Sequence, residues 1–401
     1  MASWGPSHLD QNKQCRRIST VLSCIIAILV CCGLVASETV AEPAHHPVNL
    51  TLYYPVGTNK DPDIDTNFRL SLIYGRVGSV HGVDLNTGVS IIQRDLRGFQ
   101  ATLLYSQLEG EFRGVALTGL VNYFRAESRG IQVAGLVNVV RGRFAGLQYA
   151  ALFNFTQSGF SGIQLSSVFN TNHGDGGFLQ VAGVTNMNEG SFRGVQLGAI
   201  NLTADRLVGA QLGVVNMAVR AKGFMGGLIN IAGETRGLQI APLNIIRRNY
   251  GVPIGLINID EDNGGEDWIT FGSNLAAVNT GMRTTVNRFY SMFTVGYGDL
   301  QGDVENTAFL SWHYGYAIPL GRKWSLDVDL GFVHIMPKNS DDPNQNDRLH
   351  FAVQARALAE IRFSRKVAVL GGVGISSIYS EYSSNATQKT EPLGVLGISL
   401  F

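Results

Sequence analysis

After residue 263 the sequence alternates between apolar and polar positions with a period of two. The apolar positions of the three clearest segments are Leu310, Trp312, Tyr314, Tyr316 and Ile318; Trp324, Leu326, Val328, Leu330 and Phe332; and Phe351, Val353, Ala355, Ala357, Ala359, Ile361 and Phe363. Charged residues stand only between these positions, and aromatic residues lie near the segment ends. This pattern is typical of strands that face lipid on one side and the interior of an outer-membrane β-barrel on the other.

Five further segments alternate in the same way and complete a predicted barrel of about eight antiparallel strands. They are 48–55, 67–75, 286–298, 366–379 and 391–401. Short connections are expected at 321–323 and 364–366, and long polar loops at 56–66, 299–306, 337–347 and 380–390. Outer-membrane barrels have short periplasmic turns and long external loops. Two alternatives stay open, namely a soluble β-sandwich in place of the barrel and a strand or a solenoid cap at 268–280.

The middle of the chain is an internal repeat. A glycine recurs every 16 residues from Gly82 to Gly162, Phe178 takes its place once, and the spacing then tightens to 15 and 14 as far as Gly251. Glutamine follows two residues later in eight units, at Gln100, Gln132, Gln148, Gln164, Gln180, Gln196, Gln211 and Gln239. Ten units close on asparagine, at Asn122, Asn138, Asn154, Asn170, Asn186, Asn201, Asn216, Asn230, Asn244 and Asn258.

A unit of 14–16 residues is too short for a transmembrane hairpin, which needs two strands of about 9–11 residues. Single antiparallel strands would place like residues at opposite ends of the sheet. One coil of a parallel β-solenoid fits, because identical residues then stack about 4.8 Å apart. We therefore predict about twelve coils, with the glycines at corners and the glutamines and asparagines in stacked amide ladders. The ladders serve the fold by pairing buried amides; a binding face is the alternative.

The first forty residues predict an export signal. Lys13, Arg16 and Arg17 precede an apolar run over 21–36, and small residues follow, which is the order of a cleaved secretory signal peptide. All four cysteines, Cys15, Cys24, Cys31 and Cys32, fall within this segment. The exported chain would then contain no disulfide and no thiolate site. The predicted organisation is a signal peptide over 1–41, N-terminal barrel strands over 42–78, a β-solenoid over 79–262 and C-terminal barrel strands over 263–401.

Composition agrees with an all-β envelope protein. Charged residues make up 15% of the chain, 48 of its 401 residues are glycine, and the formal net charge is zero. Stacked columns exclude like charges, lipid excludes charge from one barrel face, and a neutral chain gives no electrostatic reason to expect nucleic acid as a partner.

No catalytic, cofactor-binding or metal site is predicted, and we expect no enzyme. The histidines are scattered without ligand spacing. Asp61, Asp63 and Asp65 alternate in a loop, but Thr66 and Leu72 stand where a calcium loop needs Gly and Glu. A second acidic group, Asp260, Glu261, Asp262, Glu266 and Asp267, is expected to cap an exposed end of the solenoid. We expect Asp327, Asp329, Arg356, Glu360 and Arg362 to line and plug the barrel.

The repeat G-x-Q-x-(x)-G-x-x-N resembles a family of bacterial surface repeat-containing proteins, as do the segments 67–82, 250–259 and 274–298. The resemblance implies a Gram-negative envelope location and carries no known activity or catalytic residue. We expect a structural or adhesive protein in the outer membrane at the cell surface. Its partners would be the lipid bilayer and a protein or glycan ligand on the solenoid. The alternative is an outer-membrane channel for small solutes.

Overall fold

The computed structural model describes residues 44–262, 264–300, 304–337, 350–364, 366–382 and 385–401. The regular elements among these residues are all β-strands, which cover 77% of them, and they form a parallel solenoid and a closed antiparallel barrel. Within those ranges, no helix has the length and apolar character to cross a membrane. The predicted signal peptide lies outside the described residues.

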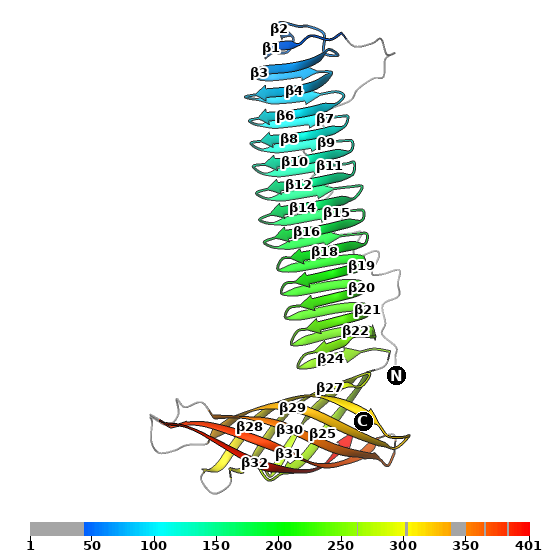
Figure 1. Ribbon diagram of the computed structural model, residues 1–401, viewed down its shortest axis with the longest axis vertical. Helices are drawn as coiled ribbons and strands as arrows, with labels where there is room; N and C mark the ends of the chain where they lie inside the picture. The colour runs from blue at the N-terminus through cyan, green and yellow to red at the C-terminus, as the bar shows by residue number, and fades with distance from the viewer. Residues whose placement is uncertain (1–43, 263, 301–303, 338–349, 365, 383–384) are drawn as a thin grey trace, which may run out of the picture. The chain divides into compact units, whose positions relative to one another are not determined.

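The solenoid has about 13 turns, each made of a longer and a shorter strand (Figure 1). Its strands are β1 (Val48–Tyr53), β2 (Val56–Gly57), β3 (Asp65–Val77), β4 (Ser79–Asn86), β5 (Val89–Ile92), β6 (Leu96–Thr102), β7 (Tyr105–Leu108), β8 (Phe112–Thr118), β9 (Val121–Phe124), β10 (Ser128–Ala134), β11 (Val137–Val140), β12 (Phe144–Ala150), β13 (Phe153–Thr156), β14 (Phe160–Ser166), β15 (Phe169–Asn172), β16 (Gly176–Ala182), β17 (Thr185–Asn188), β18 (Phe192–Leu197), β19 (Ile200–Leu212), β20 (Val215–Gly226), β21 (Ile229–Ile240), β22 (Leu243–Asn249), β23 (Val252–Ile254) and β24 (Ile257–Asp260).

The coils stack in parallel with like residues in register, as the repeat predicts. Gly130 of β10 pairs with Gly114 and Gly146, and Asn138 of β11 pairs with Asn122 and Asn154. From β19 onward the shorter strand of one coil runs directly into the longer strand of the next. The fall in repeat length from 16 to 14 residues removes the loop that separates these strands in the earlier coils.

The recurring glycine lies inside the longer strand of its coil, so the prediction that it sits at a corner is wrong. At Gly146 the backbone has a φ of 139°. A Cβ there would lie 2.0 Å from the carbonyl oxygen of Gly130 in the coil before it. Only glycine meets both demands without strain. Phe178 breaks the column, with a φ of 92°.

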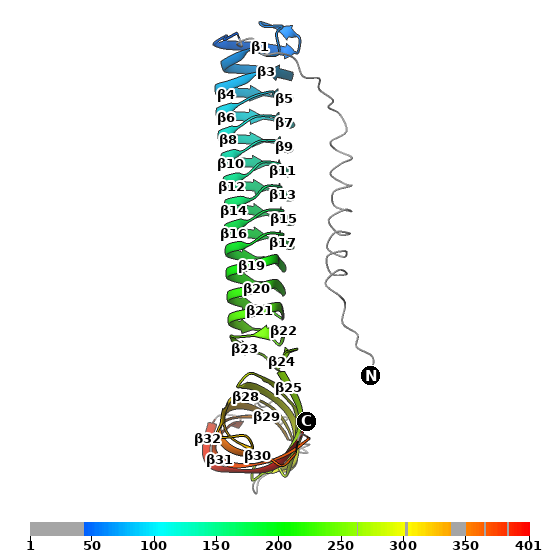
Figure 2. The ribbon, with the colours of Figure 1, turned by 90° about the vertical axis from the view of Figure 1, so that its right-hand side faces the viewer.

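The barrel consists of eight antiparallel strands in a closed ring (Figure 2). They are β25 (Gly264–Ser273), β26 (Val278–Val286), β27 (Phe289–Leu300), β28 (Val304–Pro319), β29 (Trp324–Pro337), β30 (His350–Arg362), β31 (Val367–Tyr382) and β32 (Asn385–Leu400). Closure comes from β25, which pairs with both β26 and β32. The segment 268–280, left open by the sequence, supplies most of β25 and the start of β26.

The prediction that 42–78 contributes barrel strands is wrong. Val48 of β1 pairs in parallel with Phe68 of β3, and both strands belong to the solenoid, which therefore begins before residue 79. The alternation misleads because Leu50 points outward while Asn49 and Arg69 are buried inside the first coils, as in a barrel strand. The whole solenoid therefore precedes the barrel strands in the sequence.

The predicted long loop at 380–390 is also wrong. β31 and β32 stay paired as far as Tyr382 and Asn385. This segment is polar because strands that continue beyond the apolar part of a barrel wall no longer need an apolar face.

Candidate functional site

The barrel interior contains an ion cluster centred on Arg283 of β26. Its guanidinium lies 2.8 Å from a carboxylate oxygen of Asp267, 2.6 Å from Glu360 and 3.3 Å from Asp327. The three acids come from β25, β30 and β29. All four side chains are almost fully buried. One cation thus ties together strands on several sides of the barrel, close to its short connections at 287–288, 320–323 and 363–366.

A second charged layer follows further into the interior. Arg356 donates two hydrogen bonds to Asp329, at 2.8 and 2.9 Å, and the hydroxyl of Tyr290 donates to the same carboxylate at 2.7 Å. The ring of His313 lies 3.1 Å from the amide oxygen of Gln354. Paired and hydrogen-bonded in this way, buried charges avoid the cost of an uncompensated ion.

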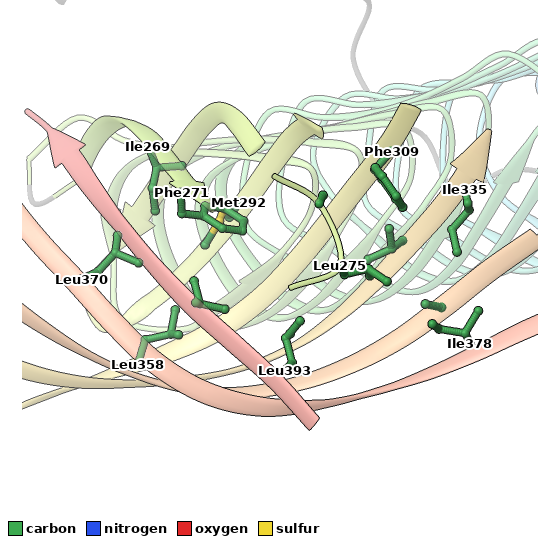
Figure 3. Packing of buried hydrophobic residues seen from close by; sticks show 14 of the residues in the cluster. Ile269, Phe271, Leu275, Met292, Phe309, Ile335, Leu358, Leu370, Ile378 and Leu393 are labelled. Carbon is green, nitrogen blue, oxygen red and sulfur yellow. The ribbon is translucent and has the colours of Figure 1, made fainter. Parts of the chain in front are cut away.

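Apolar side chains fill much of the remaining interior (Figure 3). Leu275, Phe309, Ile335, Ile378 and Leu393 lie toward the barrel end that carries the connection at 274–277. The space left in this region, between Phe271 and Leu393, has room for about one water molecule. Ion pairs and apolar packing therefore plug the barrel along the strands that the structure describes.

Sequence reasoning found part of this interior. Asp327, Asp329, Arg356 and Glu360 line the lumen as predicted. Arg362 lies at the rim, where it pairs with Glu360 at 3.3 Å and keeps much of its side chain in solvent. Arg283, Asp267 and Tyr290 were missed. The signal that could have found Arg283 is its position between Gly281 and Thr285 on the inward face of an alternating segment.

Amide ladders fill the middle of the solenoid interior. Along the asparagine column, each Nδ2 donates to the Oδ1 of the next coil, for example from Asn138 to Asn154 at 2.9 Å. A second proton donates to a backbone carbonyl of that coil, Tyr149 for Asn138, at 2.7 Å. The glutamine column runs in the other direction, with Gln164 donating to Gln148 at 2.8 Å. Both columns are buried, so these amides hold coils together and are closed to a ligand.

The first coils replace the ladder with an ion pair. Arg69 donates to both carboxylate oxygens of Asp84, at 2.6 and 2.7 Å, and Gln100 donates to the same group at 2.8 Å. Burial alone would raise the pKa of Asp84, but the Arg69 charge and these hydrogen bonds outweigh it and hold the pKa below its ordinary value. A charge can stand here because the next coil offers Gln100 instead of a second acid.

The two acidic segments do not form metal sites. Asp65 pairs with Arg94 at 2.7 Å, Asp262 pairs with Arg248 at 3.1 Å, and Asp267 belongs to the barrel interior. Over the described ranges, no group of three or more His, Cys, Asp or Glu side chains could hold a metal ion.

The last coil meets the outer wall of the barrel, so the prediction of an exposed, acid-capped solenoid end is wrong. Asn258, at the end of the asparagine ladder, donates from Nδ2 to Ser291 at 2.6 Å and from its backbone N–H to Thr284 at 3.2 Å. The Tyr314 hydroxyl donates to the carbonyl of Pro253 at 2.8 Å. Ser291 and Tyr314 point away from the lumen, because their strand neighbours face inward. The barrel thus supplies an acceptor for the final amide of the ladder.

Comparison of the sequence with family models finds no match, and neither does comparison with curated proteins. Among solved structures, the crystal structure of the N-terminal β-barrel domain of Pseudomonas aeruginosa OprF is similar to this chain, with 15% sequence identity and a TM-score of 0.27. The match covers 34% of this chain and 96% of that one. The function of the chain is therefore inferred from its own side chains.

Proposed function

We propose that this protein is a structural or adhesive component of the Gram-negative envelope, in which an outer-membrane barrel anchors a β-solenoid. The observation that carries the proposal is the division of the barrel side chains. Those that point inward form ion pairs and a packed core, whereas those that point outward are apolar and exposed. A water-soluble sandwich would show the reverse arrangement on its outer faces.

The outer wall has the composition of a lipid-facing belt. Its exposed apolar residues include Trp268, Val278, Phe293, Val295, Tyr297, Trp324, Leu330, Phe332, Val353, Val373, Ile375, Leu396 and Ile398. They come from seven of the eight strands, and β28 adds the exposed Ile318 and the half-buried Trp312. A continuous apolar surface of this extent is costly in water and is what a transmembrane barrel presents to acyl chains.

The channel alternative is weaker on this geometry. A conducting pore requires a wider barrel, of about ten strands or more, with an open lumen. The present barrel has eight strands, and the Arg283 cluster crosses its interior.

The strand order supports a position for the solenoid at the periplasmic end of the barrel. The start of β25 and the end of β32 lie at the barrel end that carries the connections 287–288, 320–323 and 363–366. In outer-membrane barrels the short connections and the chain ends face the periplasm. The solenoid precedes β25, so it enters at that end. The signal-like segment over 1–41 and the resemblance to surface repeat-containing proteins add to the case for export, and we assign the chain no catalytic role.

Cell fractionation combined with gel migration tests the proposal. We expect the protein in the outer-membrane fraction, with faster migration before heating than after it, because a folded barrel resists detergent at room temperature. Leu330→Glu, which places an acid on the exposed wall, should lower insertion, since a charge on a lipid-facing site destabilises a barrel, for Glu by less than the about 2–4 kcal/mol that Arg or Lys costs near the midplane. Gly321→Glu is the matched control, because a side chain in that short connection meets open space. Recovery of the wild-type protein in the soluble periplasm would overturn the proposal.

A further inference from the structure

The solenoid exposes apolar side chains on the faces of both of its strand layers. On the longer strands, two columns point outward beside the glutamine ladder; they include Val115, Ile131, Leu147 and Ile163 in one and Leu117, Val133, Tyr149 and Leu165 in the other. On the shorter strands, Val121, Val137, Phe153 and Phe169 point outward beside the asparagine ladder. Amides and hydroxyls occupy most of the buried positions between these columns.

The corner between the two layers is apolar as well. Exposed apolar residues stand there in seven of the coils, namely Leu104, Leu120, Leu136, Val184, Val214, Leu228 and Leu256. Leu136 is 38% exposed and Leu228 is 56% exposed. Charged residues gather at the opposite corner, where Arg113 pairs with Glu111 at 2.8 Å and Arg125 pairs with Glu109 at 2.8 Å. In cross-section, each coil is therefore a wedge with an apolar edge, two apolar flanks and a charged base.

This apolar exterior is too large to be left in water. Strands rise about 3.3 Å per residue and coils lie about 4.8 Å apart, so the two flanks of twelve coils cover roughly 2,000 Å² in all. The apolar columns make up the part of this area away from the charged corner, where basic residues such as Arg113 and Arg129 point outward. Soluble monomers seldom expose apolar patches beyond a few hundred Å². A second flat protein surface would cover one flank, but the apolar positions continue around the edge onto the other. A fluid apolar medium covers all three surfaces at once.

The last coil connects this exterior to the wall of the barrel. Its hydrogen bonds reach Ser291 and Tyr314 on the outward face, and Phe293, which follows Ser291 on that face, is exposed. Ser291 lies four residues from Asn287, in the short connection between β26 and β27. The contact therefore lies at the level of one leaflet, on the surface that the proposed function gives to lipid.

We propose that the acyl chains of this leaflet cover the solenoid, with its apolar edge toward the bilayer centre and its charged corner at the headgroups. This inference rests on the proposed membrane location of the barrel. A strand of seven residues such as β10 is about 23 Å long, close to the roughly 20–22 Å of one leaflet with its headgroups. The coils pair their backbone N–H and C=O groups with one another, as a position in hydrocarbon requires.

Site-specific quenching tests the inference in the full chain, reconstituted into vesicles of phosphatidylethanolamine and phosphatidylglycerol. The four cysteines, all within residues 15–32, are replaced by serine. Single labels are then attached at Leu136→Cys on the apolar edge, Glu127→Cys at the charged corner and Leu330→Cys on the barrel wall. The quenchers are lipids with a nitroxide on the acyl chain, lipids with a nitroxide on the headgroup, and aqueous iodide. Heat-modifiable migration confirms that each labelled variant is folded.

We expect acyl-chain nitroxides to quench the labels at 136 and 330 several-fold more than the label at 127, which should respond to iodide and headgroup nitroxides. If the label at 330 is quenched by acyl chains while the label at 136 responds only to iodide, the solenoid lies in water and the inference alone fails. The label at 136 could instead be quenched neither by acyl-chain nitroxides nor by iodide. If spin labels at 136 then couple between two chains, a second copy covers the edge and the inference fails. If acyl-chain nitroxides do not reach the label at 330, the proposed function fails as well.

Discussion

In the solenoid the strands run parallel and each coil repeats the one before it, whereas in the barrel they run antiparallel and no two neighbours are alike. Both parts carry apolar residues on their outer faces and bury polar residues inside, next to an apolar core. Parallel stacking sets like beside like, so the buried polar residue must be able to pair with itself. An amide can, because it donates and accepts at once. Asn138 accordingly lies between Asn122 and Asn154.

Antiparallel closure removes that restriction. Neighbouring strands bring different residues to the same level, so Arg283 can meet Asp267 and Glu360 from separate strands. A column of arginines 4.8 Å apart would repel itself in every coil. The polar chemistry of each interior therefore follows from its strand direction, and substitutions should fail in different ways in the two parts.

The largest effect is expected where the barrel depends on a single ion. Arg283→Met leaves three buried carboxylates without their cation, which should cost about 3–5 kcal/mol of barrel stability. The midpoint of urea unfolding, followed by loss of the fast-migrating band, measures it. Arg362→Met is the control, since that side chain is mostly exposed and its pair with Glu360 is worth about 1 kcal/mol or less. Equal shifts for the two variants would contradict the role given to Arg283.

A break in the asparagine ladder should be nearly as costly. Asn154→Leu keeps the side-chain volume similar but removes the acceptor of Asn138 and the donor to Asn170. The Leu165 carbonyl also loses its bond from Asn154, so three buried polar groups lose a partner and we expect a loss of about 3 kcal/mol. Urea unfolding followed by circular dichroism of the strand signal checks it. Val137→Leu, on an outward position, should change stability little. If it lowers stability as much as Asn154→Leu does, side-chain packing and not amide pairing determines the stability of the coils.

A side chain in the glycine column should be costly. Gly146→Ala combines a backbone φ of 139° with a Cβ only 2.0 Å from the Gly130 carbonyl oxygen. We expect a loss of about 2 kcal/mol. The same unfolding experiment measures this, with Ala145→Ser, at the neighbouring outward position, as the control. A neutral result for Gly146→Ala would mean that adjacent coils can separate locally at little cost.

A smaller, pH-dependent effect is expected at the ion pair of the first coils. The pKa of Asp84 is lower in the folded protein than its ordinary value of 3.8. The charged carboxylate therefore stabilises the solenoid fully above that value, and the contribution is lost as the pH falls through the folded-state pKa. The urea midpoint of the wild type should drop toward that of Asp84→Asn as the pH is lowered below about 4. A constant difference between the two at all pH values would contradict this assignment.

The smallest effect should be a gain. Phe178 adopts a φ of 92° and its ring is 66% exposed, so Phe178→Gly relieves backbone strain and gives up little burial. We expect about 1 kcal/mol of added stability. Phe178→Ala separates the two contributions, because it removes the ring but keeps the Cβ. If alanine stabilises as much as glycine, exposure of the ring, and not the backbone, is the source of the gain.

The repeat predicted the solenoid well because register in a stack is set by identical residues, such as the asparagines from Asn122 to Asn258. Alternation predicted that Asp327, Asp329, Arg356 and Glu360 face the lumen, since side chains change face at every residue of a strand. Alternation carries no information on strand direction, however. Leu50 and Leu70 follow the rule of a lipid-facing strand and yet stack in parallel within the solenoid.

The residues that were missed are those whose partners lie far away in the sequence. Arg283 and Glu360 are 77 positions apart, and Asp267 and Arg283 flank the segment 268–280, whose fold was left open. The contact between Asn258 and Ser291 joins the solenoid to the barrel. Neither the repeat of the solenoid nor the alternation of the barrel strands indicates this contact. Such pairings depend on how the barrel closes and on which part of its wall the last coil meets. Local periodicity in the sequence predicts neither of these.

The in-register coils also bear on how such a chain changes over generations. Each inner coil offers the same upper and lower surface, so recombination between two repeats can delete or duplicate a whole coil while every new neighbour still matches. The Arg69–Asp84 pair and the contact of Asn258 with Ser291 stay in place as fixed ends. The number of coils, and with it the length of the solenoid, can therefore change by drift or selection in steps of one coil without a new fold.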